Sequence, residues 1–590
     1  MAAGENYHNS LTSFGQCYVQ NDSSGELYYT IDGSVDFYGE PALKQDTGKW
    51  RSCFFILGAE CCERMAFYGV SSHLVDSITK KLDLQRVIAV QTVTIWQGTT
   101  YIVPLIGAIL ADSYIGRYWT IVAFSSIQFI GVCALIITGS IPTFEPTVCV
   151  ERYCASTAVR QYTAILVGLS LIALGTGGVK PCVAVFGGDQ FDEYDLRERR
   201  MKGSYFNWFY FATCVGIFVA SFFIVRIQYT SAWSVGFLVP ALSMGISIAF
   251  ILSGTPFYRF HKPRQNPFTT MFQVLVASCR NWNLDVPEDS SLLYETQNGG
   301  FTIEEKFKLK HTDTLRFLDK AAVISNAELV NENLYNPWRL CTVNQVEQLK
   351  ALINLFPIWA TGITLHAARV QVSTLFVEQG MLMDTKIDSF SLNVDLLGVF
   401  EYTSGIILVP LYDKVIIPIV RRFTGNEKGF SKLQQIGIGH FISVLSMVAA
   451  AIVETIRLNI AKELGLVYHD KNAIPLNILW QLPQYILFGI SMVFSYPAQL
   501  EFFYDESPVA LRSLCNAFLM LSFGFGYYMT SSFLHIVKYC TSKGDKIGWL
   551  PKNLNEGHLD YVFWTSAGIS FLNMLIFIIY AMKFKQRKAL

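Results

Sequence analysis

The chain has 590 residues, of which 52% are hydrophobic and 16% are charged, and its 46 basic residues balance its 46 acidic ones. Soluble domains carry about 25% charged residues, so this composition, with a mean hydropathy of +0.33, favours a membrane protein. The balanced charge gives no electrostatic reason to expect a nucleic acid or an acidic partner.

The first 50 residues are polar. They contain no basic stretch followed by an apolar core, so we predict no cleaved signal peptide. We therefore expect residues 1–50 to form a cytoplasmic N-terminal segment, and the first membrane helix to direct insertion.

Twelve apolar runs follow, each long enough to cross about 30 Å of hydrocarbon as a helix. This pattern predicts an all-α membrane protein with twelve transmembrane helices near residues 52–75, 88–112, 117–139, 161–186, 204–227, 232–254, 345–378, 392–420, 433–457, 477–504, 511–538 and 561–583.

A polar insert divides these runs into six and six. Two six-helix bundles around a central cavity are the architecture of major-facilitator transporters, which bind substrate near the middle of the membrane. We predict an N-terminal bundle at 51–254, a cytoplasmic linker at 255–344, a C-terminal bundle at 345–584 and a cytoplasmic tail at 585–590.

The first apolar run contains three charged residues, Glu60, Glu63 and Arg64. They fall at positions i, i+3 and i+4, so they project from one face of a helix. Each charge at the centre of a bilayer costs roughly 2.5–3.5 kcal/mol on insertion scales, so the cluster needs a functional reason. Carboxylates that can take up a proton and pair again internally suit a protein that moves protons across a membrane.

The loop between the second and third runs has the pattern Gly107-x4-Asp112-x3-Gly116-Arg117. The glycines allow a tight turn and close helix approach. Asp112 can bond Arg117 or the end of a neighbouring helix, which would make a gating latch. The alternative is an ordinary cytoplasmic turn. Farther along, Cys149 and Cys154 share a polar loop, and their spacing leaves a disulfide open.

Lys180 lies deep in the fourth run, between the glycines at 175–178 and Pro181. A buried ammonium needs a carboxylate partner or a substrate anion, and Glu60 and Glu63 are the candidate partners. The alternative is a lysine near a helix end that extends to water. The uncharged stretch after Pro181 favours the cavity.

Arg369 lies in the seventh run, three residues after His366 and on the same face. Its planar guanidinium could hold an anionic substrate, and a structural ion pair inside the bundle is the equal alternative. His366 is more typical of a structural histidine.

Four further polar residues stay open between two roles each. Tyr68 and Tyr101 either line the cavity or pack in the core. Glu401 is either a cavity carboxylate or one half of a helix-to-helix pair. Glu501, near the cytoplasmic end of the tenth run, fits a gate or a packing role.

Lysines and arginines are concentrated in the loops 188–203 and 421–432 and in the C-terminal tail. These segments fall on the side of the termini, so the positive-inside rule predicts cytoplasmic termini, although the bias is modest. The sequence has no nucleophile–base pair, metal-ligand spacing or phosphate loop, so we predict a protein that is not an enzyme and binds no cofactor and no metal.

Several motifs resemble a known family. Residues 60–64 look like the ExxER signature of the proton-coupled oligopeptide transporter family, 107–131 resemble its first signature pattern, and 186–191 resemble its FGADQF segment. Residues 33–37, 336–341 and 554–561 are similar to the di-/tripeptide branch of the plant nitrate/peptide transporter family. The similarity runs from about residue 28 to residue 588.

This resemblance implies proton-driven uptake by alternating access, with protons, a small solute and the lipid bilayer as partners. It implies that Glu60, Glu63, Arg64 and Lys180 couple the proton to the movement of the solute. It makes di- and tripeptides the default substrate.

The expected pocket departs from the family. Met492 stands where the peptide branch has an acid in span ten, Cys214 where the family signature has Asn, and Tyr527 where Asn is expected. Arg369 replaces a Tyr of the branch, or a His of nitrate relatives, and the tyrosine pair of span one is reduced to Phe67-Tyr68. We expect a substrate site lined by Tyr68, Tyr101, Lys180, Cys214, Arg369, Met492 and Tyr527.

These changes remove an acid and add a cation, so the pocket should be more positive than a peptide pocket. Desolvating the ammonium of a peptide without a counter-charge costs several kcal/mol. Nitrate or another small anion is therefore the alternative substrate, and a transport-inactive paralogue or receptor is the third possibility. The sequence leaves the plasma membrane and the vacuolar membrane both open.

Overall fold

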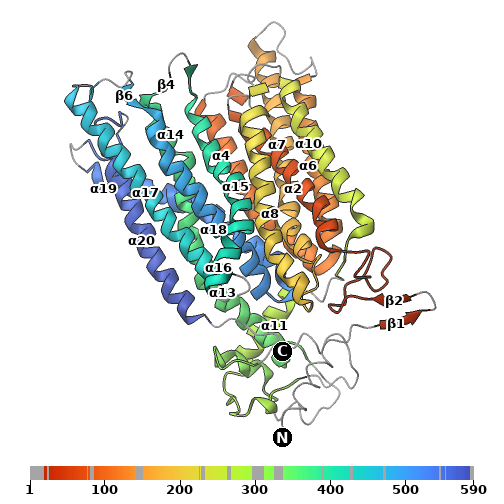
Figure 1. Cartoon of the computed structure of the whole chain (residues 1–590). Coiled ribbons are helices and arrows are strands. Elements are labelled where there is room, and N and C mark those ends of the chain that lie inside the picture. Colours follow the sequence, from red (N-terminus) through yellow and green to blue (C-terminus); the bar gives the residue numbers. More distant parts are fainter. Residues whose placement is uncertain are drawn as a thin grey trace. The chain divides into compact units, whose positions relative to one another are not determined.

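The structure of the protein is a computed structural model (Figure 1). It describes residues 19–22, 25–72, 74–75, 78–79, 86–140, 151–224, 226–227, 233–261, 267–295, 311–324, 336–387, 390–424, 429–468, 473–543, 547–551 and 553–584. The C-terminal tail from residue 585 and the side chains of Cys149 and Cys154 lie outside the described residues.

The contacts divide the chain into two compact units. Unit 1 comprises Met1–Val90 and Gly116–Lys262, and unit 2 comprises Gln91–Ile115 and Pro263–Leu590. The helices and strands of unit 1 are β1 (Val19–Asp22), β2 (Gly25–Tyr28), α2 (Lys49–Ser71), α6 (Arg117–Ser140), α7 (Glu151–Gly188), α8 (Leu196–Val219), the π-helix η4 (Ala220–Ile224), α10 (Trp233–Ser253) and the 3-10 helix η5 (Thr255–Phe257).

Unit 2 holds most of α4 (Arg86–Ile102), which begins in unit 1. Its other elements are α5 (Pro104–Leu110), the π-helix η2 (Ala111–Ile115), α11 (Pro267–Arg280), η6 (Ser290–Leu292), η8 (Arg316–Ala322), α13 (Val343–Ser373), α14 (Leu375–Met381), β3 (Met383–Asp384), β4 (Lys386–Ile387), β5 (Phe390–Ser391), η9 (Val394–Gly398), α15 (Val399–Leu411), the π-helix η10 (Tyr412–Ile416), α16 (Ile417–Thr424), α17 (Lys432–Glu463), β6 (Ile474–Asn477), η11 (Ile478–Gln481), α18 (Leu482–Glu506), η12 (Val509–Leu511), α19 (Arg512–Thr541) and α20 (Leu559–Lys583).

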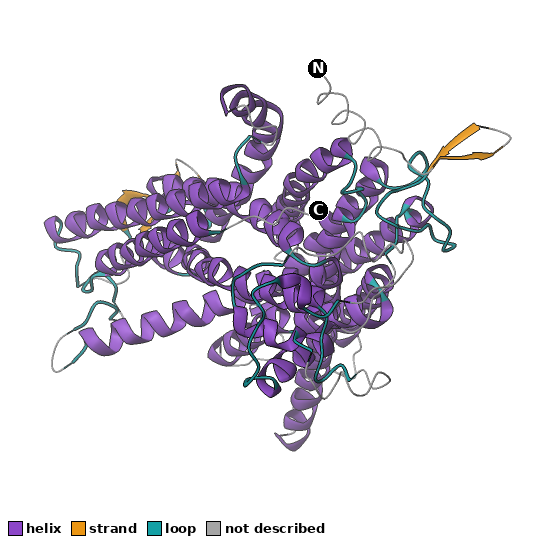
Figure 2. Cartoon of the chain, turned by 90° about the horizontal axis from the view of Figure 1, so that it is seen from below, coloured by secondary structure: helices purple, strands orange, loops and turns teal. Residues whose placement is uncertain are grey.

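Helices dominate the described chain, and the strands are short (Figure 2). The strands pair as β1 with β2 and β4 with β5, both antiparallel, and as β3 with β6, parallel. In the first pair Val19 faces Tyr28. The fold class is therefore all-α, as the apolar runs predict.

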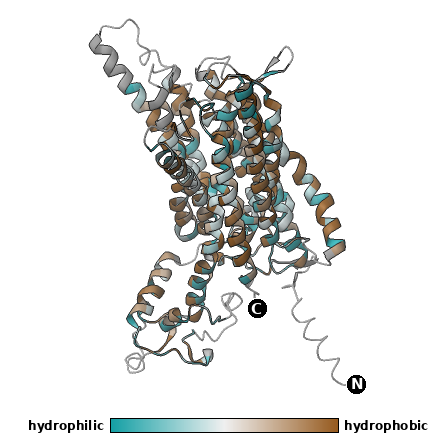
Figure 3. Ribbon diagram, turned by 90° about the vertical axis from the view of Figure 1, so that its left-hand side faces the viewer, coloured by the Kyte–Doolittle hydropathy of each residue, from teal (hydrophilic) through white to brown (hydrophobic). Residues whose placement is uncertain are grey.

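Eleven of the described helical segments are long and apolar enough to cross a membrane. Hydrophobic residues cover most of their length (Figure 3). Helix α2, with 23 residues, contains Glu60, Glu63 and Arg64 in its apolar stretch, and those charges separate it from the eleven. Eleven segments and α2 together match the twelve predicted spans. Several helices exceed the roughly 20 residues that a membrane needs, for example α7 with 38 residues.

The second predicted span does not group with the rest of the N-terminal half. By their contacts, residues 91–115 group with unit 2, and the predicted bundle bounds of 51–254 stay a prediction. The reason is packing, because α5 lies against α19 and the ring of Tyr101 stacks on the ring of Phe523 at 5.9 Å. Sequence order does not reveal which helix a span will pack against.

The predicted linker contains a small core of its own in unit 2. Helix α11 and the 3-10 helices pack on the first turns of α13 through buried residues that include Val274, Leu318, Cys341 and Val346. Burial raises the pKa of the Cys341 thiol to about 11.

A buried ammonium ties this linker core to α13. The Nζ atom of Lys350 lies 2.7 Å from Asp319 and 2.9 Å from Glu347, and all three side chains are buried. His311, Asp319 and Glu347 offer oxygen and nitrogen atoms within 4.8 Å of one another. Since Lys350 already supplies the positive charge among these carboxylates, this cluster is an ion-pair network.

In unit 1, residues 29–48 form a segment that we call the strap. Val35 and Phe260 exchange backbone hydrogen bonds of 2.9 and 2.8 Å, so the strap pairs with the chain that follows α10. The backbone N–H of Ile31, also in the strap, donates to the carboxylate of Asp192 at 2.8 Å. The strap is thus bonded to both the α7–α8 loop and the end of α10.

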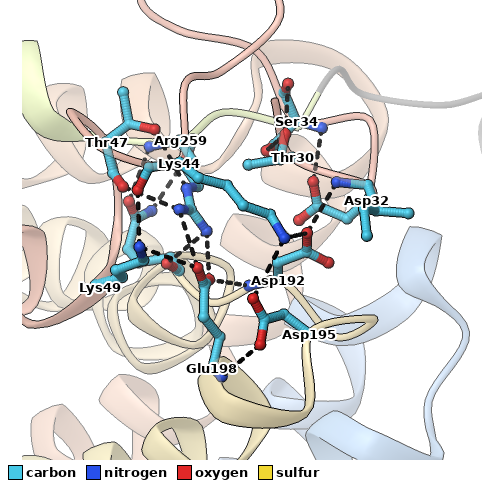
Figure 4. A network of polar contacts seen from close by, with 12 residues as sticks. Thr30, Asp32, Ser34, Lys44, Thr47, Lys49, Asp192, Asp195, Glu198 and Arg259 are labelled. Carbon is cyan, nitrogen blue, oxygen red and sulfur yellow. Dashed lines mark hydrogen bonds and ion pairs between the residues drawn. The ribbon is translucent and has the colours of Figure 1, made fainter. Parts of the chain in front are cut away.

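Charged side chains complete this attachment (Figure 4). Arg259, which is fully buried, lies 2.7 Å from Glu198, and the Nζ of Lys44 lies 3.5 Å from Asp192. Burial, followed by the charge of Asp32, raises the pKa of Asp192 above its usual range. The network joins three segments that are far apart in the sequence.

Candidate functional site

The charged cluster of α2 forms as its spacing predicts. The Nε of Arg64 lies 3.0 Å from Glu60, and its Nη2 lies 2.5 Å from Glu63. All three residues are buried, with exposures of 4%, 1% and 8% for Glu60, Glu63 and Arg64. One guanidinium therefore serves two carboxylates, so the cluster carries one negative charge while both acids are ionised.

Two neutral side chains from other helices also bond these carboxylates. Thr213 of α8 donates its hydroxyl to Glu60 at 3.2 Å, and Gln128 of α6 donates its amide to Glu63 at 3.0 Å. Sequence reasoning missed both partners, because threonine and glutamine in a membrane helix carry no charge to signal them. Each bond favours the ionised form of its acid.

Glycines allow these helices to approach. A Cβ on Gly216 of α8 would lie 2.4 Å from the carbonyl oxygen of Cys61 and 2.8 Å from Arg64, so α8 packs directly on α2. A Cβ on Gly175 of α7 would lie 2.6 Å from Gln128. The small residues thus position both neutral partners of the acids.

Lys180 of α7 joins this cluster, as the sequence suggests. Its side chain is 7% exposed, and its Nζ lies 4.1 Å above the ring of Phe67. Lys180 interacts electrostatically with Arg64, Glu63 and Glu60. The four predicted proton-coupling residues therefore lie together in unit 1.

Two predicted substrate residues also lie in unit 1. Tyr68 is half-buried, and its ring contacts that of Phe67 edge-on at 5.5 Å. Cys214 is fully buried next to Thr213 in α8. Their position beside the charged cluster is compatible with either the cavity or the packing role.

In unit 2, Arg369 of α13 pairs with a carboxylate. Its Nη1 lies 2.5 Å from Glu401 of α15, and its Nη2 donates to the hydroxyl of Tyr402 at 3.0 Å. Arg369 and Glu401 therefore form an ion pair between α13 and α15, which agrees with the helix-pairing role of both residues and leaves their cavity roles untested. The extra positive charge that the sequence suggested is balanced.

Two of the remaining predicted substrate residues of unit 2, Tyr101 and Tyr527, belong to an aromatic cluster. The ring of Tyr101 lies 5.8 Å from that of Tyr527 and 5.9 Å from that of Phe523. The ring of His366 stacks on Phe523 at 3.6 Å. Met492 of α18 is 1% exposed, so in this conformation a solute does not reach it.

The predicted gating residues form bonds within their own units. Arg117 pairs with Asp189, so its carboxylate partner comes from the α7–α8 loop. Asp112 accepts a 3.1 Å hydrogen bond from the backbone N–H of Leu514, near the start of α19. Asp112 thus meets the second of its predicted partners, the end of a neighbouring helix.

Glu501 pairs with a lysine of α17. It lies 2.8 Å from the Nζ of Lys432, which also pairs with Asp505. This three-residue group ties the start of α17 to the end of α18. It agrees with the packing role that the sequence offered for Glu501, and leaves a gating role untested.

Comparison with known proteins gives consistent matches. The sequence model of the POT family, PTR2, matches residues 118–550. The chain is 52% identical over 561 residues to Protein NRT1/ PTR FAMILY 8.3 of Arabidopsis thaliana, covering 95% of this chain and 96% of that protein. It is 48% identical to Protein NRT1/ PTR FAMILY 8.5 of the same plant over 575 residues, covering 97% and 96%.

The fold has solved counterparts. The crystal structure of the POT family transporter PepTSo matches with a TM-score of 0.58 at 20% identity, covering 91% of this chain and 98% of that one. An auto-inhibited POT family peptide transporter matches with a TM-score of 0.56 at 21% identity, covering 91% and 97%. The chain is thus a multi-pass membrane protein of the POT family, whose members are transporters and not enzymes.

Proposed function

We propose that this protein is a proton-coupled symporter of small solutes that works by alternating access, with di- and tripeptides as its default substrates. The observation that carries the proposal is the buried cluster of Glu60, Glu63, Arg64 and Lys180 in unit 1. Acids and cations at this depth are costly unless they serve a proton or substrate pathway.

The cluster can respond to a proton through its pairings. Arg64 bonds both Glu60 and Glu63, and Lys180 lies within their electrostatic reach. Protonation of either acid weakens its bond to Arg64 and changes the charge that Lys180 experiences. Protonation thus shifts the equilibrium between two arrangements of the helices. A solute that binds one arrangement more tightly shifts the same equilibrium, so its binding is coupled to the proton.

Peptides are the default because the chain resembles the di-/tripeptide branch of the family, and the intact coupling residues argue against a transport-inactive paralogue. The chain is about half identical to two plant proteins named for the nitrate/peptide transporter family. We propose the plasma membrane or the vacuolar membrane as its location, with both termini in the cytoplasm.

A small anion, with nitrate as the simplest case, is the second candidate substrate. It is favoured by Arg369 in α13 and by Met492 at the position where the peptide branch has an acid. Glu401 balances the charge of Arg369, so an anion has to compete with that carboxylate.

The test is two-electrode recording in oocytes at acidic external pH, comparing alanyl-alanine, nitrate and organic acids. We expect inward currents with alanyl-alanine, and we expect Glu60→Gln and Lys180→Ala to abolish them at equal surface expression. If nitrate or organic acids give currents and alanyl-alanine gives none, the substrate is a small anion and not a peptide.

Two variants test the pocket itself. If Arg369 and Met492 set the preference, Arg369→Tyr and Met492→Glu will shift selectivity toward dipeptides. Unchanged preference in both would reject the pocket assignment. No proton-coupled current with any solute would favour a transport-inactive paralogue or a receptor.

A further inference from the structure

One hydrogen-bond partner of the α2 cluster can change the direction of its bond. The hydroxyl oxygen of Thr213 lies 3.2 Å from Oε1 of Glu60 and 3.1 Å from the carbonyl oxygen of Phe209, one turn earlier on α8. A hydroxyl has one proton to donate and two lone pairs that accept. Thr213 can therefore donate to only one of these two oxygens at a time.

The second group at Oε1 of Glu60 lacks this choice. The Nε of Arg64 lies 3.0 Å from the same oxygen. A guanidinium donates hydrogen bonds and has no atom that accepts one. While Glu60 is ionised, both Arg64 and Thr213 suit this oxygen. Once the oxygen carries a proton, Arg64 no longer suits it, whereas the hydroxyl of Thr213 can turn toward Phe209 and accept a hydrogen bond from the new acid.

Glu63 has a neutral partner of a different kind. Its Oε1 accepts a 3.0 Å hydrogen bond from the amide nitrogen of Gln128, which is fully buried. The amide oxygen of Gln128 has no partner among the described residues. An amide nitrogen only donates, so Gln128 would have to turn its whole buried amide over to accept from a protonated Glu63. The neutral partner of Glu60 thus suits both protonation states by a rotation of one hydroxyl, and that of Glu63 does not.

Packing holds Thr213 within reach of Glu60. Gly216 lies one turn after Thr213 on the same face of α8, and a Cβ there would lie 2.4 Å from the carbonyl oxygen of Cys61. From α10, the hydroxyl of Ser247 donates at 2.8 Å to the backbone carbonyl of the residue before Glu60. The turn of α2 that carries Glu60 is thus fixed by α8 and by α10.

The titratable groups that act on Glu60 come from three helices. They are Cys61, Glu63 and Arg64 of α2, Lys180 of α7 and Tyr205 of α8. Helices α6 and α10 contain no charged residue over 118–140 and 233–253. Thr213 differs from all of these groups, because it stays neutral at every pH and changes only the direction of its hydrogen bond.

We propose that Thr213 is a positioning residue of the proton step, whose hydroxyl holds Glu60 in both protonation states. It donates to the carboxylate and accepts from the carboxylic acid, so Arg64 can leave Glu60 while Glu60 keeps its place. The inference rests on the proposed function, in which the α2 cluster takes up the transported proton. It adds to that function a residue of α8 that sets the pH range of transport.

The step balances in protons and in hydrogen bonds. One proton binds Oε1 of Glu60, the hydroxyl of Thr213 turns to the carbonyl of Phe209, and its oxygen accepts from the acid. Arg64 keeps Glu63, which lies 2.5 Å from its Nη2. When the proton leaves, the hydroxyl turns back. Because a hydrogen bond to a carboxylate is stronger than one between neutral groups, Thr213 favours release of the proton.

The first measurement is the proton-coupled current in oocytes over a series of external pH values, with alanyl-alanine or nitrate as the probe. Thr213→Val keeps the shape of the side chain and removes its hydroxyl. We expect the pH of half-maximal current to rise by about one unit, because Glu60 loses a bond that favours its ionised form. The maximal current should fall, because the proton then leaves less readily.

A conservative variant and a matched control separate the hydroxyl from the packing. Thr213→Ser keeps the hydroxyl and should keep the pH profile of the unmodified protein. Thr120 of α6 is fully buried, and its hydroxyl donates at 2.8 Å to the carbonyl of Gly116, one turn earlier. Thr120→Val therefore removes a back-bond like that from Thr213 to Phe209, and it should leave the pH of half-maximal current unchanged.

A second measurement does not depend on transport. Infrared difference spectra of the purified protein in phosphatidylcholine nanodiscs follow the carbonyl band of protonated acids as the pH changes. The band that Glu60→Gln removes belongs to Glu60. In Thr213→Val this band should move in frequency, and its midpoint should rise by about one pH unit. In Thr213→Ser both should stay as in the unmodified protein.

The outcomes separate this inference from the proposed function. An unchanged midpoint in Thr213→Val by both measurements, with currents still abolished by Glu60→Gln, overturns the inference alone. Equal shifts in Thr213→Val and in Thr213→Ser also overturn it, because packing and not the hydroxyl is then the cause. Full currents in Glu60→Gln overturn the proposed function. If Glu60→Gln removes no pH-dependent band, both are overturned.

Discussion

Among single residues, Gly216 lets α8 approach the charged cluster of α2. The missing side chain lets α8 lie against Cys61 and Arg64, with distances of 2.4 and 2.8 Å for an added Cβ. Thr213, one turn earlier on α8, reaches Glu60 because of this approach. The polar network therefore depends on a residue that has no polar side chain.

We predict that Gly216→Ala will destabilise the protein by about 1–3 kcal/mol, because the added methyl group must push α8 away from α2. Thermal unfolding of the detergent-solubilised protein measures the loss. Proton-coupled uptake should fall with it, since the bond from Thr213 to Glu60 lengthens.

Gly568→Ala in α20 is the control for this change. A Cβ at Gly568 meets nothing within 4 Å, so the substitution should be neutral or slightly stabilising, as expected for alanine in a helix. Equal effects at Gly216 and Gly568 would contradict the close-approach argument.

Among the elements, the strap is held in part by the buried pair of Arg259 and Glu198. Arg259 bonds Glu198 at 2.7 Å and donates to the carbonyl of Thr47 at 2.9 Å (Figure 4). The backbone N–H of Arg259 donates to the Gln190 side chain at 2.8 Å, and the Gln190 amide returns a bond to the Arg259 carbonyl at 3.1 Å. The end of α10, the start of α8 and the strap thus share one buried side chain.

We predict that Arg259→Ala will destabilise the protein by about 3–5 kcal/mol, because Glu198 is left as a buried charge without this partner. Fluorescence-detected thermal stability of the solubilised protein will check it. Adding Glu198→Gln to the same chain should recover part of the loss.

Arg199→Ala is the matched control, because Arg199 is exposed and follows Glu198 directly in α8. It should change the free energy of unfolding by less than about 0.5 kcal/mol. If the double variant is no more stable than Arg259→Ala, the loss of stability comes from lost packing and not from the unpaired carboxylate of Glu198.

For the whole molecule, the chain passes from one unit to the other three times, and one of these boundaries lies between Ile115 and Gly116. Gly116 has φ of 84°, in the left-handed region, and nothing lies within 4 Å of an added Cβ. A side chain at position 116 would therefore meet no neighbouring atoms, but residues other than glycine rarely adopt this positive φ. The turn from η2 into α6 depends on this glycine.

Replacing Gly116 should therefore cost energy through the backbone alone. We predict a loss of about 1–2 kcal/mol for Gly116→Ala and a smaller loss for Gly116→Asn, because asparagine tolerates this conformation. Thermal unfolding and uptake by the two variants will be compared. The control is Gly398→Ala, whose φ is −57° and whose Cβ would also meet nothing, and it should have no cost. Equal losses in alanine and asparagine variants would reject the backbone explanation.

Local patterns in the sequence predicted much of the fold and part of the site. The apolar runs gave the membrane helices, and the spacing of Glu60, Glu63 and Arg64 placed them on one face, because both signals have a range of a few residues. The grouping of residues 91–115 with unit 2 was not predictable, since it depends on the packing of α5 against α19.

The sequence by itself determined the membrane class, the family and the charges that lie inside the helices. The tertiary structure decided which groups those charges meet: Glu401 for Arg369, 32 residues away, Thr213 for Glu60, 153 residues away, and the Leu514 N–H for Asp112, 402 residues away. The physical reason is that helical periodicity sets only the face on which a side chain lies. Its partner is set by the neighbouring helix, and that neighbour is chosen by packing over the whole unit.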